Sequence, residues 1–96
     1  MDEKFFSMPQ RLLLLIGEYY EKTGKWVSIS EIYNQLNRNT HVWYNWQDYL
    51  VENGLITIKE TRSKVRSIKK EVMLTEKGLR VYKVLKEFLT KLKEVG

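Results

Sequence analysis

Several residue types on which enzymes and metal sites depend are missing or scarce in this chain of 96 residues. There is no cysteine, which excludes disulfides and thiolate metal ligands. The only histidine is His41, so a multi-histidine metal site cannot form, and the scattered carboxylates supply no nucleophile with a neighbouring base. The five glycines form no phosphate-binding loop. We therefore expect no enzymatic activity, no metal and no cofactor.

Long hydrophobic runs are also missing. The longest uninterrupted apolar stretch, Leu12 to Ile16, is far shorter than the about 20 residues that a membrane-spanning helix needs. The N-terminus has neither the apolar segment nor the small-residue cleavage site of a secretory signal. We expect a cytoplasmic protein without membrane contact, and a length of 96 residues predicts one domain over 1–96.

The formal net charge of +5 is confined to one stretch, residues 59–70. The rest of the chain has equal numbers of basic and acidic side chains. Within the stretch, one acid, Glu60, is outnumbered by six basic residues: Lys59, Arg62, Lys64, Arg66, Lys69 and Lys70. Such a segment suits a polyanion, because Lys and Arg neutralise phosphates and release condensed counterions. The alternative is a solvated hairpin whose charge prevents edge-to-edge pairing.

Start and stop signals predict four helices. The first runs from about residue 8 to 22, with Ser7 as N-cap, Pro9 in the first turn and Gly24 after its end. Its Leu12 to Ile16 run is apolar on nearly every side. This helix is therefore either central to the core or shared between the core and a subunit interface.

The middle of the chain also contains residues that begin and end helices. A short extended segment over 25–27 precedes a second helix over 29–36, in which Ser28 is the cap and Glu31 reaches back to it. A polar turn follows at 37–39. Thr40 is placed to cap a third helix that runs to Asn53 and stops at Gly54.

The last third predicts two strands and a helix. Residues 55–58 and 72–74 are rich in side chains that fit a pleated sheet, and the basic stretch joins them as a hairpin. Thr75 caps a final helix that runs to about Glu94. The fold class is mainly α with a small β-hairpin.

The third helix has two different faces on a 3.6-residue period. One face groups the apolar residues Trp43, Trp46 and Leu50, which we expect in the core because large apolar rings at this spacing are mostly buried. The other face groups polar residues that are solvated in most helices: His41, Tyr44, Asn45 and Asp48.

The predicted element order resembles the winged helix-turn-helix DNA-binding domain. Three stretches are similar to those of MarR-like and PadR-like regulators and of small winged-helix proteins of archaea and their viruses: Ser28-Ile29-Ser30-Glu31-Ile32, Leu50-Val51-Glu52-Asn53-Gly54-Leu55-Ile56 and Leu74-Thr75-Glu76-Lys77-Gly78. In such folds the third helix enters the major groove, and the hairpin, called the wing, contacts the backbone or the minor groove. Winged helices also serve as protein–protein interaction modules.

The resemblance implies roles for individual residues. It brings His41, Tyr44 and Asn45 nearest the bases, and an Asn can pair with adenine N6 and N7. Asp48 would repel phosphate, and it either accepts from cytosine N4 or pairs with a neighbouring Lys or Arg. The expected phosphate contacts are Ser30, Arg38 and Thr40, besides the basic residues of the wing.

A further pattern lies in the last helix, over 76–95. Its apolar residues recur at alternating spacings of four and three, which is typical of a helical seam: Val81, Leu85, Phe88, Leu92 and Val95. We expect this seam to form the interface of a homodimer, and the alternative is a helix packed wholly on its own domain. We hypothesise a sequence-specific transcriptional regulator that binds double-stranded DNA as a homodimer. The alternatives are a non-specific architectural DNA-binding protein and a protein-interaction module, and nothing in the sequence indicates a small-molecule ligand.

Overall fold

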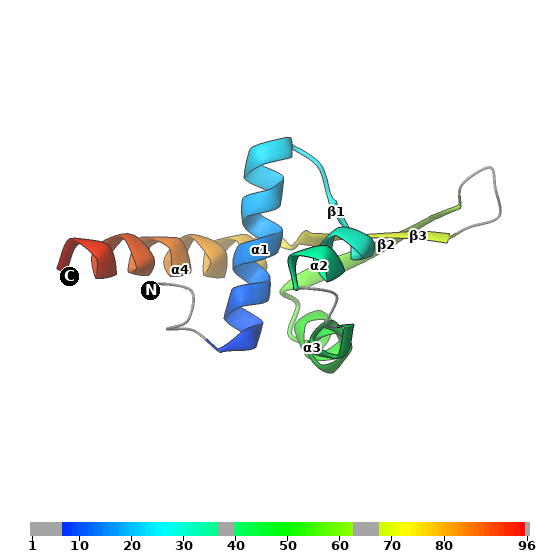
Figure 1. Cartoon of the computed structure of the whole chain (residues 1–96), viewed down its shortest axis with the longest axis horizontal. Helices are drawn as coiled ribbons and strands as arrows, with labels where there is room; N and C mark the ends of the chain where they lie inside the picture. Colours follow the sequence, from blue (N-terminus) through cyan, green and yellow to red (C-terminus); the bar gives the residue numbers. More distant parts are fainter. Residues whose placement is uncertain (1–6, 37–39, 63–67, 96) are drawn as a thin grey trace.

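Helices pack against one end of a small antiparallel sheet in the structure, a computed structural model that describes residues 7–36, 40–62 and 68–95 (Figure 1). The elements of these residues are α1 (Met8–Thr23), β1 (Val27–Ser28), α2 (Ile29–Gln35), α3 (Thr40–Glu52), β2 (Ile56–Arg62), β3 (Ile68–Leu74) and α4 (Glu76–Val95). This order confirms the predicted winged-helix fold, which is mainly α with a small sheet.

Most of the predicted helix ends are confirmed. Gly24 and Gly54 follow α1 and α3 with φ of 70° and 69°, the left-handed region that glycine adopts at no steric cost. The Ser28 hydroxyl accepts from the backbone N–H of Glu31 at 3.2 Å. The Thr75 hydroxyl accepts from the N–H of Gly78 at 3.0 Å. These side chains satisfy backbone donors that have no partner within their helices.

Two details of the predicted caps are wrong, and a third cap lacks its side-chain hydrogen bond. Ser7 is the N-cap of α1 as predicted, but its hydroxyl donates to Gln10 Oε1 and accepts from no backbone N–H, because Pro9 removes one donor of the first turn and the Gln10 side chain competes for the hydroxyl. The Glu31 carboxylate accepts from Gln35 Nε2 at 3.3 Å and does not reach back to the cap. Thr40 is itself the first helical residue. An Asn precedes it in the sequence, and Asn is as favourable as Thr at a cap, so the pattern could not fix the start.

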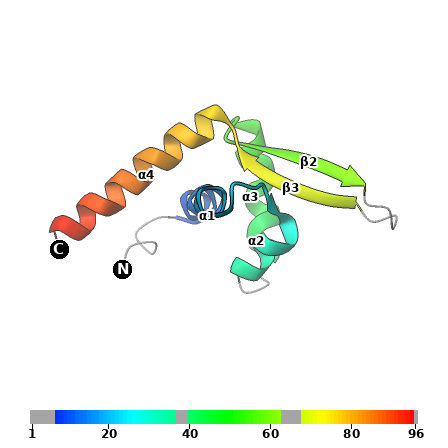
Figure 2. The same ribbon diagram turned by 90° about the horizontal axis from the view of Figure 1, so that it is seen from above.

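The sheet has the strand order β1-β3-β2, with both pairings antiparallel. The two long strands pair from Ile56 opposite Leu74 to Arg62 opposite Ile68, so they are longer than the predicted 55–58 and 72–74. The predicted segment 25–27 becomes a strand over residues 27–28. We call the paired residues 56–62 and 68–74 the stem of the wing. It projects from the body of the molecule (Figure 2).

The core is built around α1. Leu12, Leu13, Leu14 and Ile16 are each at most 2% exposed, so this helix is central to the core, the first of the two alternatives. In Figure 1, α1 runs between α4 on one side and α2 and α3 on the other. The residues that cover it from the other elements include Val27, Ile32, Trp43, Leu50, Ile56, Val72, Leu74 and Tyr82.

The end of β3 is joined to the turn after α3. The Thr75 N–H donates to the Leu55 carbonyl at 3.1 Å, and the Thr75 hydroxyl donates to the Gly54 carbonyl. Lys77 Nζ donates to the Asn53 carbonyl at 2.9 Å. Gly78 lies against the Leu55 carbonyl, where a Cβ would collide with the backbone. This joint fixes the start of α4 relative to the end of α3.

A second close approach lies where α1 crosses α4. A Cβ on Gly17 would lie 2.5 Å from Cδ1 of Tyr82, whose side chain is buried. Lys86 reaches the same crossing, with Nζ 5.7 Å from the Tyr82 ring centroid and 3.4 Å from Glu21. Burial raises the pKa of the Tyr82 hydroxyl above its ordinary value, and the negative charge of Glu21 raises it further.

Gly17→Ala should destabilise the fold by about 1–3 kcal/mol, the usual cost of inserting a methyl group into a packed contact. Helix propensity alone predicts the opposite sign, a gain of up to about 1 kcal/mol. Urea unfolding measures the difference. The cost should shrink when Tyr82→Leu is present in the same chain. A neutral or stabilising Gly17→Ala would contradict the crossing.

Candidate nucleic-acid interface

The two faces of α3 separate as the helical period predicts. Trp43 and Leu50 are fully buried, and Trp46 packs against the core. Each of the four polar residues expected at the bases is exposed: His41, Tyr44, Asn45 and Asp48. The structure thus brings these four side chains to one solvent-facing surface, and their contact with DNA stays a prediction.

Tyr44 has a neighbour that the sequence did not indicate. Its ring lies 6.4 Å from the ring of Tyr33 in α2, centroid to centroid, although Tyr44 is 65% exposed. Burial raises the pKa of Tyr33 to about 12, and the Tyr44 side chain adds to the shift. The Tyr33 hydroxyl is therefore protonated at neutral pH and able to donate a hydrogen bond. The pair couples the exposed face of α3 to α2.

Positive charge is missing from α2 and α3. Neither sequence contains Lys or Arg, whereas Glu31, Asp48 and Glu52 are acidic. Among the described residues no cation lies within ion-pair distance of Asp48, so the pairing we allowed for it is not found there. A surface of this kind does not attract phosphates.

The phosphate contacts expected near the turn are only partly described. Ser30 is exposed in the first turn of α2, and Thr40 is half-buried at the start of α3. Arg38 lies outside the described residues. The structure therefore adds no cation to this part of the predicted interface.

The stem of the wing is less cationic than the sequence count indicated. Glu71 lies just beyond the basic stretch, and the sheet register brings it opposite Lys59. Its carboxylate is 3.9 Å from Lys59 Nζ and 4.0 Å from Lys69 Nζ, while Lys70 Nζ is 3.8 Å from Glu60. The three lysines of the stem thus have carboxylate neighbours.

The other basic residues of the wing are Arg62, Lys64 and Arg66. Arg62 ends β2, but its side chain lies outside the described part of the structure, as do Lys64 and Arg66 entirely. The electrostatic role that we expect of these three rests on the sequence.

The predicted seam of α4 divides into two parts. Val81 and Leu85 pack partly against the chain's own core, and Leu92 is half-buried. Phe88 and Val95 are 42% and 88% exposed, and so is Val84, at 65%, which the predicted seam did not include. The C-terminal half of α4 extends beyond α1 (Figures 1 and 2). Val84, Phe88 and Val95 therefore form an exposed apolar strip along one side of α4, which we call its outer side.

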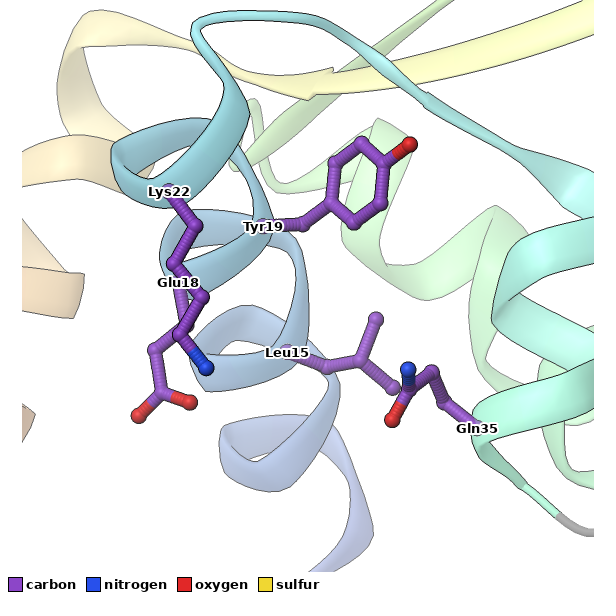
Figure 3. A pocket seen from close by; sticks show the side chains of 5 residues that line it. All are labelled: Leu15, Glu18, Tyr19, Lys22 and Gln35. Carbon is purple, nitrogen blue, oxygen red and sulfur yellow. The ribbon is translucent and has the colours of Figure 1, made fainter.

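Two adjoining hollows lie between α1 and α2. They share Leu15, Glu18 and Gln35, and their volumes are about 100 and 120 Å³. Figure 3 shows the first, which Tyr19 and Lys22 also line. Sites for drug-sized ligands have volumes of roughly 300–1,000 Å³. These hollows have room for a few water molecules.

Metal-binding clusters and membrane-spanning helices are both absent from the part of the chain that the structure describes. No group of three or more His, Asp or Glu side chains there could hold a metal ion. No helix in those ranges is long and apolar enough to cross a bilayer.

The architecture, with a helix-turn-helix pair followed by a β-hairpin, defines a winged helix-turn-helix protein. A mutant of MepR from a multidrug-resistant clinical isolate of Staphylococcus aureus is similar, with a TM-score of 0.70 and 17% identity over 93% of this chain and 60% of that one. Staphylococcus aureus MarR in complex with salicylate and kanamycin has a TM-score of 0.64 and 24% identity over 86% and 53%. These likenesses confirm a MarR-like winged-helix fold.

The sequence comparisons are less informative. No family model and no curated protein matches the chain. The chain spans less than two thirds of the length of either similar structure.

Proposed function

We propose that this chain is a transcriptional regulator that binds double-stranded DNA sequence-specifically as a homodimer. The observation that carries the proposal is the combination of a winged-helix fold, an exposed polar face on α3 and a net positive charge concentrated in the wing. In this arrangement α3 lies in the major groove, and the wing follows the backbone or the minor groove. Such a regulator acts in the cytoplasm.

The charges divide the work between the two elements. Because α3 has two acidic residues and no basic one, it contributes little to general attraction for DNA. The sequence-independent affinity must then come from the wing, with Arg38, Ser30 and Thr40 as additional backbone contacts. Base recognition falls to the N-terminal half of α3, which presents His41, Tyr44 and Asn45 ahead of the acidic Asp48 and Glu52.

Changing Arg62, Lys64 and Arg66 together to Ala should weaken binding to all duplexes alike. The slope of log affinity against log salt should fall by up to ~0.9 for each phosphate that the wing no longer neutralises. Fluorescence anisotropy over a salt series measures both. The control replaces three exposed lysines outside the wing with Ala, namely Lys22, Lys83 and Lys93, and should leave the slope unchanged. An unchanged slope in the wing variant would remove the wing from the interface.

Asn45→Ala should cost ~1–3 kcal/mol on the preferred site and relax discrimination at one base pair, because a bidentate pair of hydrogen bonds to the base is removed. The preferred site comes from selection in a random duplex pool. Asn34→Ala, at an exposed position of α2, is the matched control. Equal weakening on every sequence would mean that Asn45 contacts the backbone.

The acidic character of α2 and α3 favours one alternative, a protein-interaction winged helix. The exposed rings of Tyr44 and Tyr49, beside Asp48 and Glu52, suit a basic partner. Salt-dependent binding to random duplex separates this module from a DNA-binding protein. The ratio of specific to non-specific affinity then separates a regulator from an architectural DNA-binding protein.

The outer side of α4 is the proposed dimer interface. Val84 and Val95 on this side are 65% and 88% exposed. A second copy of the chain is the simplest cover, because a two-fold interface is self-complementary. If two-fold pairing separates the two α3 helices by about 34 Å, they can enter successive major grooves one DNA turn apart. The two-fold symmetry of the dimer would then require a palindromic site.

Val84→Glu should convert the dimer to a monomer. The new carboxylate would be buried without a partner in the dimer interface, whereas in the monomer it would stay in water. Sedimentation equilibrium at micromolar concentration measures the mass, and circular dichroism checks that the fold is kept. Thr90→Glu adds the same charge at an exposed position on another side of α4 and should stay dimeric. A monomeric unmodified chain would contradict both the dimer and the palindromic site.

A further inference from the structure

A contact at the base of the wing involves Trp26, Lys59 and Glu71. Lys59 Nζ lies 4.7 Å from the centroid of the Trp26 ring and 3.9 Å from Glu71 Oε1. Lys59 and Glu71 are directly opposite each other in the β2–β3 ladder. Trp26 comes from another part of the molecule, immediately before β1. One ammonium group therefore connects β2 and β3 to the residue that precedes β1.

The contact lies on the side of the sheet that faces away from the core. Ile56 and Ile58 of β2 pair with Leu74 and Val72 and pack on the core side. Side chains alternate along a strand, so Lys59 and Glu71 lie on the opposite side. An aromatic ring from outside the hairpin thus lies against an exposed lysine of the stem.

The short strand β1 explains why such a contact matters. Only Val27 and Ser28 pair with β3, so few backbone hydrogen bonds tie the wing to the segment after α1. A two-stranded hairpin by itself is only marginally stable in water. Interactions at the base of the stem therefore help to fix the direction in which the wing projects.

We propose that Lys59 is a positioning residue that holds the wing in its binding direction and does not neutralise a phosphate. Its ammonium lies beside both the Trp26 ring and the Glu71 carboxylate, so part of its charge is offset within the protein, although its side chain is 51% exposed. This inference rests on the proposed DNA-binding function. Without the contact, a smaller fraction of molecules has a correctly directed wing, and the apparent Kd rises by the inverse of that fraction.

A salt series on random duplex separates positioning from phosphate contact. Trp26→Leu and Lys59→Met should each weaken binding roughly two- to tenfold, the factor that a cation–π contact supplies. The salt slope should equal that of the unmodified chain, because the bound wing makes the same phosphate contacts. The double variant should bind about as well as either single one. Trp26→Phe and Lys59→Arg should keep most of the affinity.

Tyr20→Leu is the matched control, because it removes an aromatic ring that is 38% exposed on α1, and it should leave affinity unchanged. Two results would overturn the proposal. One is a slope that falls by ~0.9 in Lys59→Met while Trp26→Leu binds normally, which would make Lys59 a phosphate contact. The other is a pair of affinity decreases that add in the double variant. If Trp26→Leu does not fold, Lys59→Met, at an exposed position, decides between the two roles through its slope.

The contact also has a signature that needs no DNA. The Trp26 ring current should shift the Lys59 side-chain protons upfield in NMR spectra of the free protein, and Trp26→Leu should abolish the shift. An absent shift would reject the contact. A shift together with no duplex binding by the unmodified chain would reject the DNA-binding function, and the positioning role with it, while the contact itself stands.

Discussion

The burial of α1 on several sides constrains the position of every other element. A helix with Leu12, Leu13, Leu14 and Ile16 all buried cannot lie on a surface, because each apolar side needs cover. The sheet, α2 and α3 supply that cover from one direction and α4 supplies it from another (Figure 1). Gly17 lets α4 approach until the Tyr82 ring lies on the α1 backbone. The exposed face of α3 and the projecting wing are consequences of this arrangement around one helix.

The acidic residues of α2 and α3 and the basic residues of the wing lie on different elements, and this has a consequence for binding. General attraction for a polyanion depends on cations near phosphates, whereas base recognition depends on donors and acceptors in the groove. The acidic α3 is unsuited to the first task but can perform the second. Within the wing, Glu60 and Glu71 lie beside lysines of the stem, so they moderate its charge while stabilising the strand pairing across the ladder. In the proposed function, the non-specific affinity for DNA is therefore lower than the six basic residues alone would give.

The sequence predicted features with local causes and missed those that depend on register. The stops at Gly24 and Gly54, the cap at Ser28 and the two faces of α3 follow from residue type and helical period. The full length of β2 and β3 could not be predicted from residue type, because the Lys and Arg residues there are not typical of strands. The position of Glu71 opposite Lys59 depends on the strand register, which the sequence did not indicate. The Trp26 contact needs β1 in place as well. The predicted seam of α4 did not include Val84, because spacing alone does not show which part of the helix the chain's own core covers.

The helix α4 links the two parts of the proposed function. Its first turn is held to the end of α3 by Thr75 and Lys77, which bond the backbone at 53–55. Its outer side carries the proposed dimer interface, including Val84. A helix is stiff over a length of this kind, so in a dimer built on α4 the separation of the two α3 helices follows from how the two α4 helices pair. A rotation at the dimer interface would therefore move both α3 helices relative to successive major grooves, even though no residue of the interface touches DNA.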